Sequence, residues 1–104
     1  MIIVLGSVQV QPNRLEQALQ ISQAHVARSR LEAGCIEHGV HVDADNPNRL
    51  VFVERWASLA ALQTHFAVPA SKHTVHALAA LAAAPPSISL FNAEQLPSPG
   101  QPAA

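Results

Sequence analysis

The stretch 50–76, which reads LVFVERWASLAALQTHFAVPASKHTVH, constrains the fold of this chain more than any other. Its first side chains alternate, with Phe52 and Trp56 on the side opposite to Val51 and Val53. Apolar residues then recur at helical spacing without an intervening loop, so the pattern predicts a strand that leads directly into a helix. The only Trp and three of the six His lie here, so most of the candidate chemistry is concentrated in this stretch.

Composition limits the chain to one small domain of 104 residues, in which only three Phe and one Trp supply aromatic side chains. A core this modest favours association with another chain. The net charge is -1 and the charged residues are scattered singly, which argues against nucleic acid and membrane partners. Cys35 is the only cysteine, which excludes an internal disulfide and a Cys-based zinc site and favours a cytoplasmic setting. No apolar run is long enough to cross a bilayer, and the apolar start lacks a basic lead, so it predicts a strand and not a signal peptide.

The first half of the chain predicts a strand, a helix and a second strand. Residues 2–11 form the first strand, apolar on both sides in its early part. Asn13 and Glu16 resemble a capping box, so we expect a helix from there to about Leu31 and a left-handed turn at Gly34. Residues 36–43 then alternate as the second strand, and the turn formers of residues 44–48 predict a hairpin to the third.

The second half predicts two helices and a last strand. Ser58 is a plausible N-cap for the helix that carries His65, and Pro69 should end it. Ser71 should begin a further helix through Ala84, with an apolar stripe formed by Val75, Leu78, Ala79 and Ala82. Residues 87–94 read as the final strand. We expect the folded domain to span residues 1–96 and residues 97–104 to form a flexible tail.

The order strand, helix, strand, strand, helices, strand is that of the α+β ferredoxin-like fold, with a four-stranded antiparallel sheet. The helices can cover one face of this sheet. Because the first and third strands are apolar on both sides, the second face also needs cover, and a second copy of the chain would supply it. The pattern therefore predicts a homodimer that packs sheet to sheet.

Histidine is the side chain most suited to proton transfer near neutral pH. His38 and His41 are an odd number of residues apart on one strand and must point to opposite faces. We interpret His41 as solvated, and His38 as either a hydrogen-bonded core residue or a substrate contact. His65 follows Trp56 on the buried side of a short helix, where it is either a core histidine or a catalytic residue.

His73 and His76, three residues apart on the next helix, could join His65 in a metal site. The spacing matches no usual zinc pattern, and no carboxylate occurs between Glu54 and Glu94, so we predict no metal. The two residues are instead either partly exposed or candidate substrate contacts. Only four glycines are present and none forms a phosphate-binding loop, so no cofactor is expected.

Glu54 lies two residues from Trp56 on an otherwise apolar strand face that also carries Phe52. A carboxylate in that setting must either be paired or lie at a rim. We favour pairing, for which the candidate partners are Arg14, Arg28, Arg49 and Arg55. Trp56 is either a core residue or an aromatic surface on which a flat ligand stacks.

The run 30–65 resembles the antibiotic biosynthesis monooxygenase domain. Members of that family carry a Glu-Pro/Ala-Gly-Cys segment before the second strand, an Asp-Pro turn, Glu-x-Trp at the end of the third strand and a His on the next helix. The matching residues here are Glu32 to Cys35, Asn46 and Pro47, Glu54 to Trp56, and His65. The likeness extends over nearly the whole chain to Leu96.

The resemblance implies a dimeric ferredoxin-like α+β barrel with an apolar pocket, and cofactor-free oxidation of quinols or anthrone-like aromatics by O2. It makes His65 the base or hydrogen-bond partner and Trp56 the ring that orients the substrate, with His38, Phe52, Phe66, His73 and His76 as substrate-binding candidates. Haem-degrading relatives use an Asn, a Trp and a His. The corresponding positions here are about Ser7, His65 and the segment 73–76, so haem degradation is not expected. The alternatives are an isomerase or lyase of a small metabolite and a non-enzymatic dimeric ligand-binding protein.

Overall fold

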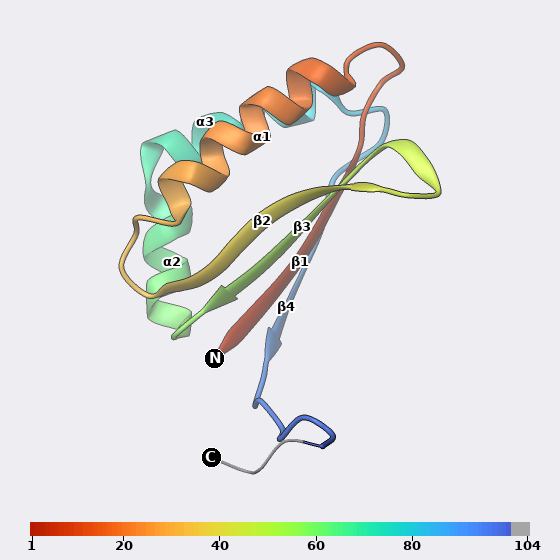
Figure 1. The fold of residues 1–104 in the computed structure, drawn as a ribbon. Helices are drawn as coiled ribbons and strands as arrows, with labels where there is room; N and C mark the ends of the chain where they lie inside the picture. The colour runs from red at the N-terminus through yellow and green to blue at the C-terminus, as the bar shows by residue number, and fades with distance from the viewer. Residues whose placement is uncertain (101–104) are drawn as a thin grey trace.

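The computed structural model describes residues 1–100, which form four strands and three helices (Figure 1). In chain order these are β1 (Ile2–Gln9), α1 (Leu15–Ser29), β2 (Cys35–Asp43), β3 (Asn46–Trp56), α2 (Leu59–Ala67), α3 (Pro69–Leu81) and β4 (Ser87–Asn92). The strands form one antiparallel sheet in the order β2-β3-β1-β4. The predicted ferredoxin-like α+β fold is confirmed.

All three helices lie on one face of the sheet (Figure 1). Buried side chains of β1 and β3 point toward them and divide into two apolar clusters. One cluster contains Val8, Leu50 and Leu78, and the other contains Trp56 and Leu62. The second cluster brings the end of β3 against α2, which is the contact that places the candidate site.

The opposite face of the sheet carries apolar side chains that no described helix covers (Figure 1). The alternate residues of the central strands that point away from the helices include Ile3, Leu5 and Val53, and the paired edge strand adds Phe91. Leu5 is 45% exposed and Phe91 is 49% exposed. The prediction that the sheet is apolar on both faces is therefore confirmed.

The turn before α1 differs from the predicted capping box. Asn13 adopts a left-handed backbone conformation with φ of 68°, and Arg14 takes the N-cap position without any side-chain capping bond. Asn tolerates this conformation better than most residues, so it serves the turn instead of the cap. The helix also ends at Ser29, two residues before the predicted Leu31, which is fully outside the core.

Gly34 controls how closely α2 approaches the turn between α1 and β2. Its φ is +83°, as the predicted left-handed turn requires, and a Cβ atom there would lie 2.5 Å from the Cβ of Ala61. The carbonyl of Gly34 also accepts a 2.8 Å hydrogen bond from the backbone N–H of Ala57. A glycine at this position thus lets α2, with His65 on it, pack against the turn between α1 and β2.

The N-cap predicted at Ser58 is confirmed, because its hydroxyl accepts a 3.1 Å hydrogen bond from the backbone N–H of Ala61. The hairpin is tighter than predicted, since β3 already begins at Asn46. α3 begins at Pro69 and not at Ser71, because proline fits the first position of a helix as well as it ends the preceding one.

The end and the buried side of α3 also differ from prediction. The helix ends at Leu81 instead of Ala84, and Ala82 pairs with Val10 in an isolated bridge. Its buried residues are Ser71, Thr74 and Leu78, whereas Val75 is 64% exposed. The apolar stripe therefore mispredicted the orientation of the helix. Small polar residues on the buried side leave room for the cavity described below.

Smaller differences concern the outer ends of the sheet and the chain terminus. β1 ends at Gln9 and β4 ends at Asn92, each two residues before the predicted boundary. Within the predicted tail, residues 97–100 contain no helix or strand, and residues 101–104 lie outside the described part of the chain. None of the helices described is long and apolar enough to span a membrane.

Candidate functional site

A cavity of about 490 Å³ lies between the sheet and the helices α2 and α3. Strands β1, β3 and β4 form one wall, and their lining side chains include Val8, Phe52 and Ile88. The surface of the cavity is predominantly apolar, and it is open to solvent on one side. This size and character are typical of a site for a small organic ligand.

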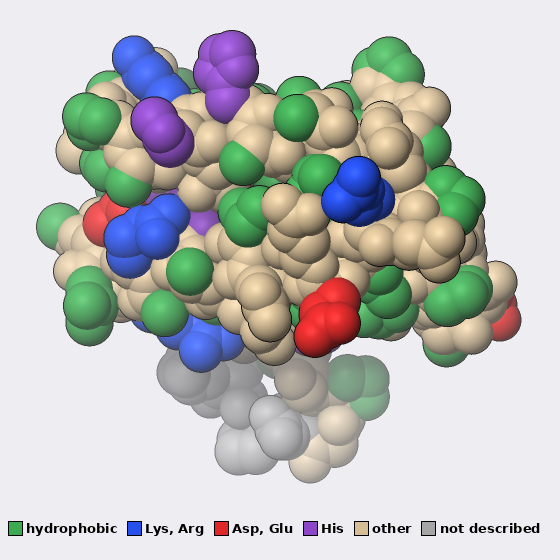
Figure 2. Space-filling model, turned by 90° about the horizontal axis from the view of Figure 1, so that it is seen from above, with side chains coloured by type: hydrophobic (Ala, Val, Ile, Leu, Met, Phe, Trp, Pro, Cys, Tyr) green, Lys and Arg blue, Asp and Glu red, His purple; other side chains and the backbone are tan. Residues whose placement is uncertain are grey.

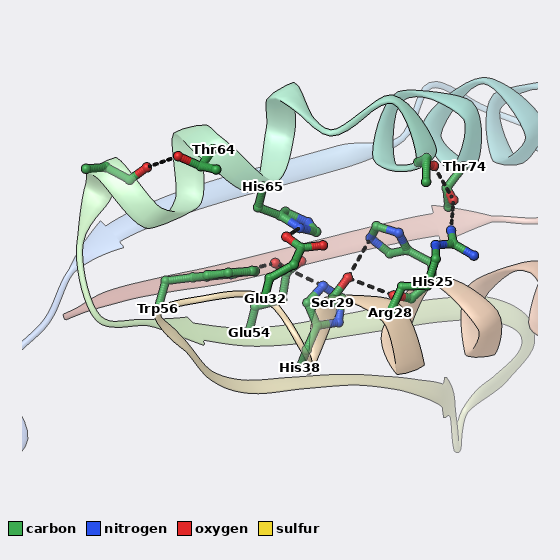
Figure 3. A network of polar contacts seen from close by, with 12 residues as sticks. His25, Arg28, Ser29, Glu32, His38, Glu54, Trp56, Thr64, His65 and Thr74 are labelled. Atoms are coloured by element: carbon green, nitrogen blue, oxygen red, sulfur yellow. Dashed lines mark hydrogen bonds and ion pairs between the residues drawn. The ribbon is translucent and has the colours of Figure 1, made fainter.

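Three histidines from three different elements meet beside this cavity (Figure 3). His25 comes from α1, His38 from β2 and His65 from α2, and all three are buried. The ring centroids are 5.2 Å apart for His25 and His38, 5.2 Å for His25 and His65, and 5.6 Å for His38 and His65. His25 and His65 line the cavity, whereas His38 lies behind them.

His65 is held from two sides. Its Nδ1 lies 2.7 Å from a carboxylate oxygen of Glu32, and its ring packs against the indole of Trp56 with centroids 4.6 Å apart (Figure 3). The imidazole is 3% exposed. If the Nδ1–H donates to Glu32, Nε2 keeps its lone pair and can accept a proton. The geometry is that of a carboxylate-oriented histidine at the wall of an apolar cavity.

Glu54 accepts a 2.9 Å hydrogen bond from the indole N–H of Trp56, and the same oxygen lies 3.2 Å from Nε2 of His38. Burial by itself raises the pKa of this carboxyl, but the contacts with His38, Trp56 and His65 outweigh it and hold the pKa below its usual value. Glu54 is therefore a buried carboxylate that carries its charge. The predicted arginine partner is wrong, because Arg49 pairs with Asp43 and Arg55 with Glu37 on the rim and outer side of the sheet.

His25 lies one turn before Ser29 on α1, and its Nε2 is 3.5 Å from the Ser29 hydroxyl. Burial, followed by the neighbouring His38 and His65, lowers its pKa from 6.5 to about 4. His25 is thus neutral at physiological pH and can act there as a hydrogen-bonding or ligating group.

This buried histidine should make the protein less stable in mild acid. The folded-state pKa of about 4 lies below the unfolded value of 6.5, so the unfolded chain binds the proton more readily. We expect the free energy of unfolding to fall by about 3 kcal/mol as the pH drops from 6.5 to 4, and the contribution of His25 to level off below that. Urea unfolding with a chelator present, at several pH values over this range, measures it.

A His25→Gln variant is the matched control for that measurement, since glutamine does not titrate. The free energy of unfolding of this variant should depend much less on pH between 6.5 and 4.5. The loss of stability that follows protonation of Glu54 should remain at lower pH. An unchanged slope in the variant would show that His25 does not carry the effect.

The structure brings several of the predicted site residues to the cavity. Phe52, Phe66, His65 and His76 line it. His38 is within contact of His65 but does not reach the cavity, and His41 is exposed on the other side of the strand, as predicted.

Two of the predicted residues lie outside the cavity. His73 lines a separate hollow between α1 and α3. Trp56 is fully buried and touches the cavity only through His65, so it can position that histidine but not stack on a ligand.

Two residues of the site, His25 and Glu32, were not among the predicted site residues, although Glu32 begins the segment that resembles the family motif. His25 shares a helical face with Ala18, Ser22 and Ser29, and this spacing of four, three and four residues is a signal that could have placed it on the buried side of α1. Glu32 lies in a loop, where no periodicity indicates the direction of its side chain. Its contact with His65 spans 33 residues and depends on how α2 packs against the turn that follows α1.

Charged side chains are sparse around the site. On the face seen in Figure 2, Lys, Arg, Asp and Glu side chains are scattered and form no continuous patch of one sign. Lys72 is the one lysine or arginine among the residues that line the cavity. This distribution agrees with a small, largely apolar ligand.

The fold and the cavity define a ferredoxin-like α+β protein with a histidine-lined apolar cavity. The chain belongs to the antibiotic biosynthesis monooxygenase family, whose sequence profile matches residues 1–77. An uncharacterized protein of Synechocystis is 33% identical over 90 residues, which are 86% of this chain and 61% of the relative. The chain thus spans about three fifths of the length of that relative.

Solved structures show the same fold. An antibiotic biosynthesis monooxygenase is 25% identical, with a TM-score of 0.84 over 91% of this chain and 100% of its own. A candidate antibiotic biosynthesis monooxygenase from Deinococcus radiodurans is 24% identical, with a TM-score of 0.89 over 94% of this chain and 97% of its own. A protein from Shewanella oneidensis is 26% identical, with a TM-score of 0.82 over 86% of this chain and 87% of its own.

Proposed function

We propose that the protein is a cofactor-independent monooxygenase that oxidises a quinol or a hydroxylated aromatic with O2. The observation that carries this proposal is the orientation of His65, whose Nδ1 is fixed by Glu32 at the wall of an apolar cavity of about 490 Å³. A base can convert a phenol into an electron-rich anion, and an apolar cavity keeps water away from that anion. Membership of the antibiotic biosynthesis monooxygenase family supports the same reaction class.

In the proposed reaction, Nε2 of His65 accepts the phenolic proton, and Glu32 stabilises the imidazolium that results. The substrate anion then reduces O2 directly. One oxygen atom enters the product and the other leaves as water, so the substrate supplies all the electrons. Phe52 and Phe66 provide the apolar surface that excludes water and contacts the aromatic ring.

Oxygen consumption by metal-stripped protein, with a panel of quinols and anthrone-type phenols, tests the proposal. Protein-dependent uptake above the autoxidation blank, together with one atom of ¹⁸O from labelled O2 in the product, is the expected result. No uptake above the blank with any member of the panel would remove the support for an oxygenase. Isomerisation of small metabolites and ligand binding in the same cavity would then be the activities to assay.

We also propose that the protein is a homodimer that associates through the outer face of the sheet. Leu5 and Phe91, each about half exposed, lie on that face with Ile3, Val51 and Val53. Sheet-to-sheet packing of two copies would remove this apolar surface from water.

A Leu5→Lys substitution should therefore weaken the dimer. A twofold axis places two copies of the substitution in one interface. Together they should reduce the free energy of association by about 3 kcal/mol or more, which raises the dissociation constant more than about 100-fold. Light scattering coupled to size exclusion measures the mass of wild type and variant. Leu31→Lys is the matched control, because Leu31 is 89% exposed and follows α1, away from the sheet. A monomeric wild type, or equal masses for the two variants, would contradict the proposed interface.

A further inference from the structure

We infer that His25, His38 and His65 form a binding site for a divalent late transition metal ion such as Zn²⁺, an inference that goes beyond the proposed oxygenation. One ring nitrogen from each residue lies within 4.8 Å of the other two. In a tetrahedral site with bonds of 2.0–2.1 Å, ligand nitrogens are separated by about 3.4 Å. No pair of these nitrogens therefore has to approach by more than about 1.4 Å to reach that separation.

The surroundings of His38 carry the argument further. This side chain is 2% exposed, and neither of its ring nitrogens has a hydrogen-bond partner among the described residues. Its Nε2 contacts Glu54 only as an ion-pair neighbour at 3.2 Å. A buried polar atom without a partner costs about 1–3 kcal/mol, and a metal ion bound by one nitrogen would remove part of that cost.

An oxygen atom of the kind that orients metal ligands also lies near each of the three histidines. Glu32 contacts Nδ1 of His65, which leaves Nε2 for the ion. Glu54 lies beside His38, and the hydroxyl of Ser29 lies beside His25. Carboxylates that contact ligating imidazoles fix the ring orientation and raise the basicity of the ligand. The two carboxylates also balance the charge of a divalent ion.

The donor set selects the ion. Three imidazole nitrogens suit Zn²⁺, Co²⁺, Ni²⁺ or Cu²⁺, whereas Mg²⁺ and Ca²⁺ require oxygen ligands. His25 and His65 line the open cavity, which provides a path for the ion to enter and a free position for a fourth ligand. If the proposed function is correct, an occupied site engages Nε2 of His65 and the metal inhibits oxygenation. That consequence rests on the proposed function, but the binding itself does not.

Calorimetric titration of chelator-treated protein, prepared without a polyhistidine tag, tests the site with Zn²⁺ and no substrate. We expect one equivalent to bind, and His25→Gln and His38→Gln each to weaken the affinity more than 100-fold. Glu32→Gln, which alters only an orienting group, should weaken it 10- to 100-fold. The visible absorption of the Co²⁺ complex should have the intensity of a tetrahedral site, which identifies the geometry even if one variant fails to fold.

Two surface controls keep the result specific. His41→Gln changes an exposed histidine on the same strand as His38 and should leave the affinity unchanged. His73→Gln changes a histidine of α3 that lies outside the cavity and should also leave the affinity unchanged. The site would be overturned if wild-type protein binds Zn²⁺ no more tightly than His25→Gln, or if binding is lost in His73→Gln but kept in His25→Gln. Because this titration contains neither substrate nor O2, its failure leaves the test of the oxygenase separate.

Discussion

Replacing His65 by glutamine is expected to lower kcat/KM for quinol oxidation by about 10²- to 10⁴-fold, the contribution typical of a positioned general base. Glutamine is close in size and can keep a hydrogen bond to Glu32, but it cannot accept the phenolic proton. The loss should fall mainly on kcat, since the aromatic lining of the cavity is unchanged. Initial rates of oxygen uptake over a range of substrate concentrations, with the autoxidation rate subtracted, give both constants.

Variants of two neighbouring residues show whether the effect belongs to the base. Glu32→Gln keeps the imidazole but removes the charge that orients it, so kcat should fall less than in His65→Gln. His76→Gln changes another residue that lines the cavity. His76 takes no part in the proposed proton transfer, so the main effect of this variant should be on KM. If His65→Gln retains full activity while His76→Gln abolishes it, the base has been assigned to the wrong helix.

The sequence predicted the strand side of the site better than the loop and helix contributions. Strict alternation places Phe52, Glu54 and Trp56 on one face of β3 and separates His38 from His41, and the structure agrees with each of these placements. Side chains of a strand alternate between its two faces, so the position of a residue in the strand fixes the face on which its side chain lies. The pairing of β2 with β3 is irregular at Ile36, whose side chain is 50% exposed, and again between Val42 and Asp43.

On the helices, the same reasoning depended on apolar residues and therefore mispredicted α3. The buried positions Ser71 and Thr74 are polar, and Val75 next to them is exposed. Thr74 can lie on the buried side because its hydroxyl is hydrogen-bonded there. It donates to the carbonyl of Ala70 and accepts from the guanidinium of Arg28 on α1. A contact between two helices cannot be read from the composition of one of them.

The pairing of Glu54 could not be predicted for a similar reason. A buried carboxylate requires a partner, and arginine is the usual candidate. Here the requirement is met by the Trp56 N–H on the same strand and by His38 across the strand pair, in register with Glu54. The sequence therefore predicted that Glu54 is paired, but the choice of partner depended on the alignment of β2 with β3.

Replacing Glu54 by leucine should consequently destabilise the protein by about 3–5 kcal/mol. Leucine fills similar space but leaves the indole N–H of Trp56, which is fully buried, without an acceptor and removes the carboxylate beside the His38 ring. Glu54→Gln is the matched control, because the amide oxygen can still accept from Trp56, and it should cost about 1 kcal/mol. Urea unfolding monitored by far-ultraviolet circular dichroism measures both values at pH 7.

A double-mutant cycle with Trp56→Phe separates the hydrogen bond from the rest of that loss. Phenylalanine has no N–H, so Glu54→Leu in the Trp56→Phe background no longer leaves an unpaired indole donor. We expect the double variant to be more stable than the sum of the single changes implies, by about 1–3 kcal/mol. Strict additivity would mean that the bond between Glu54 and Trp56 contributes nothing, and that the carboxylate is retained for its contact with His38 and the histidines beside the cavity.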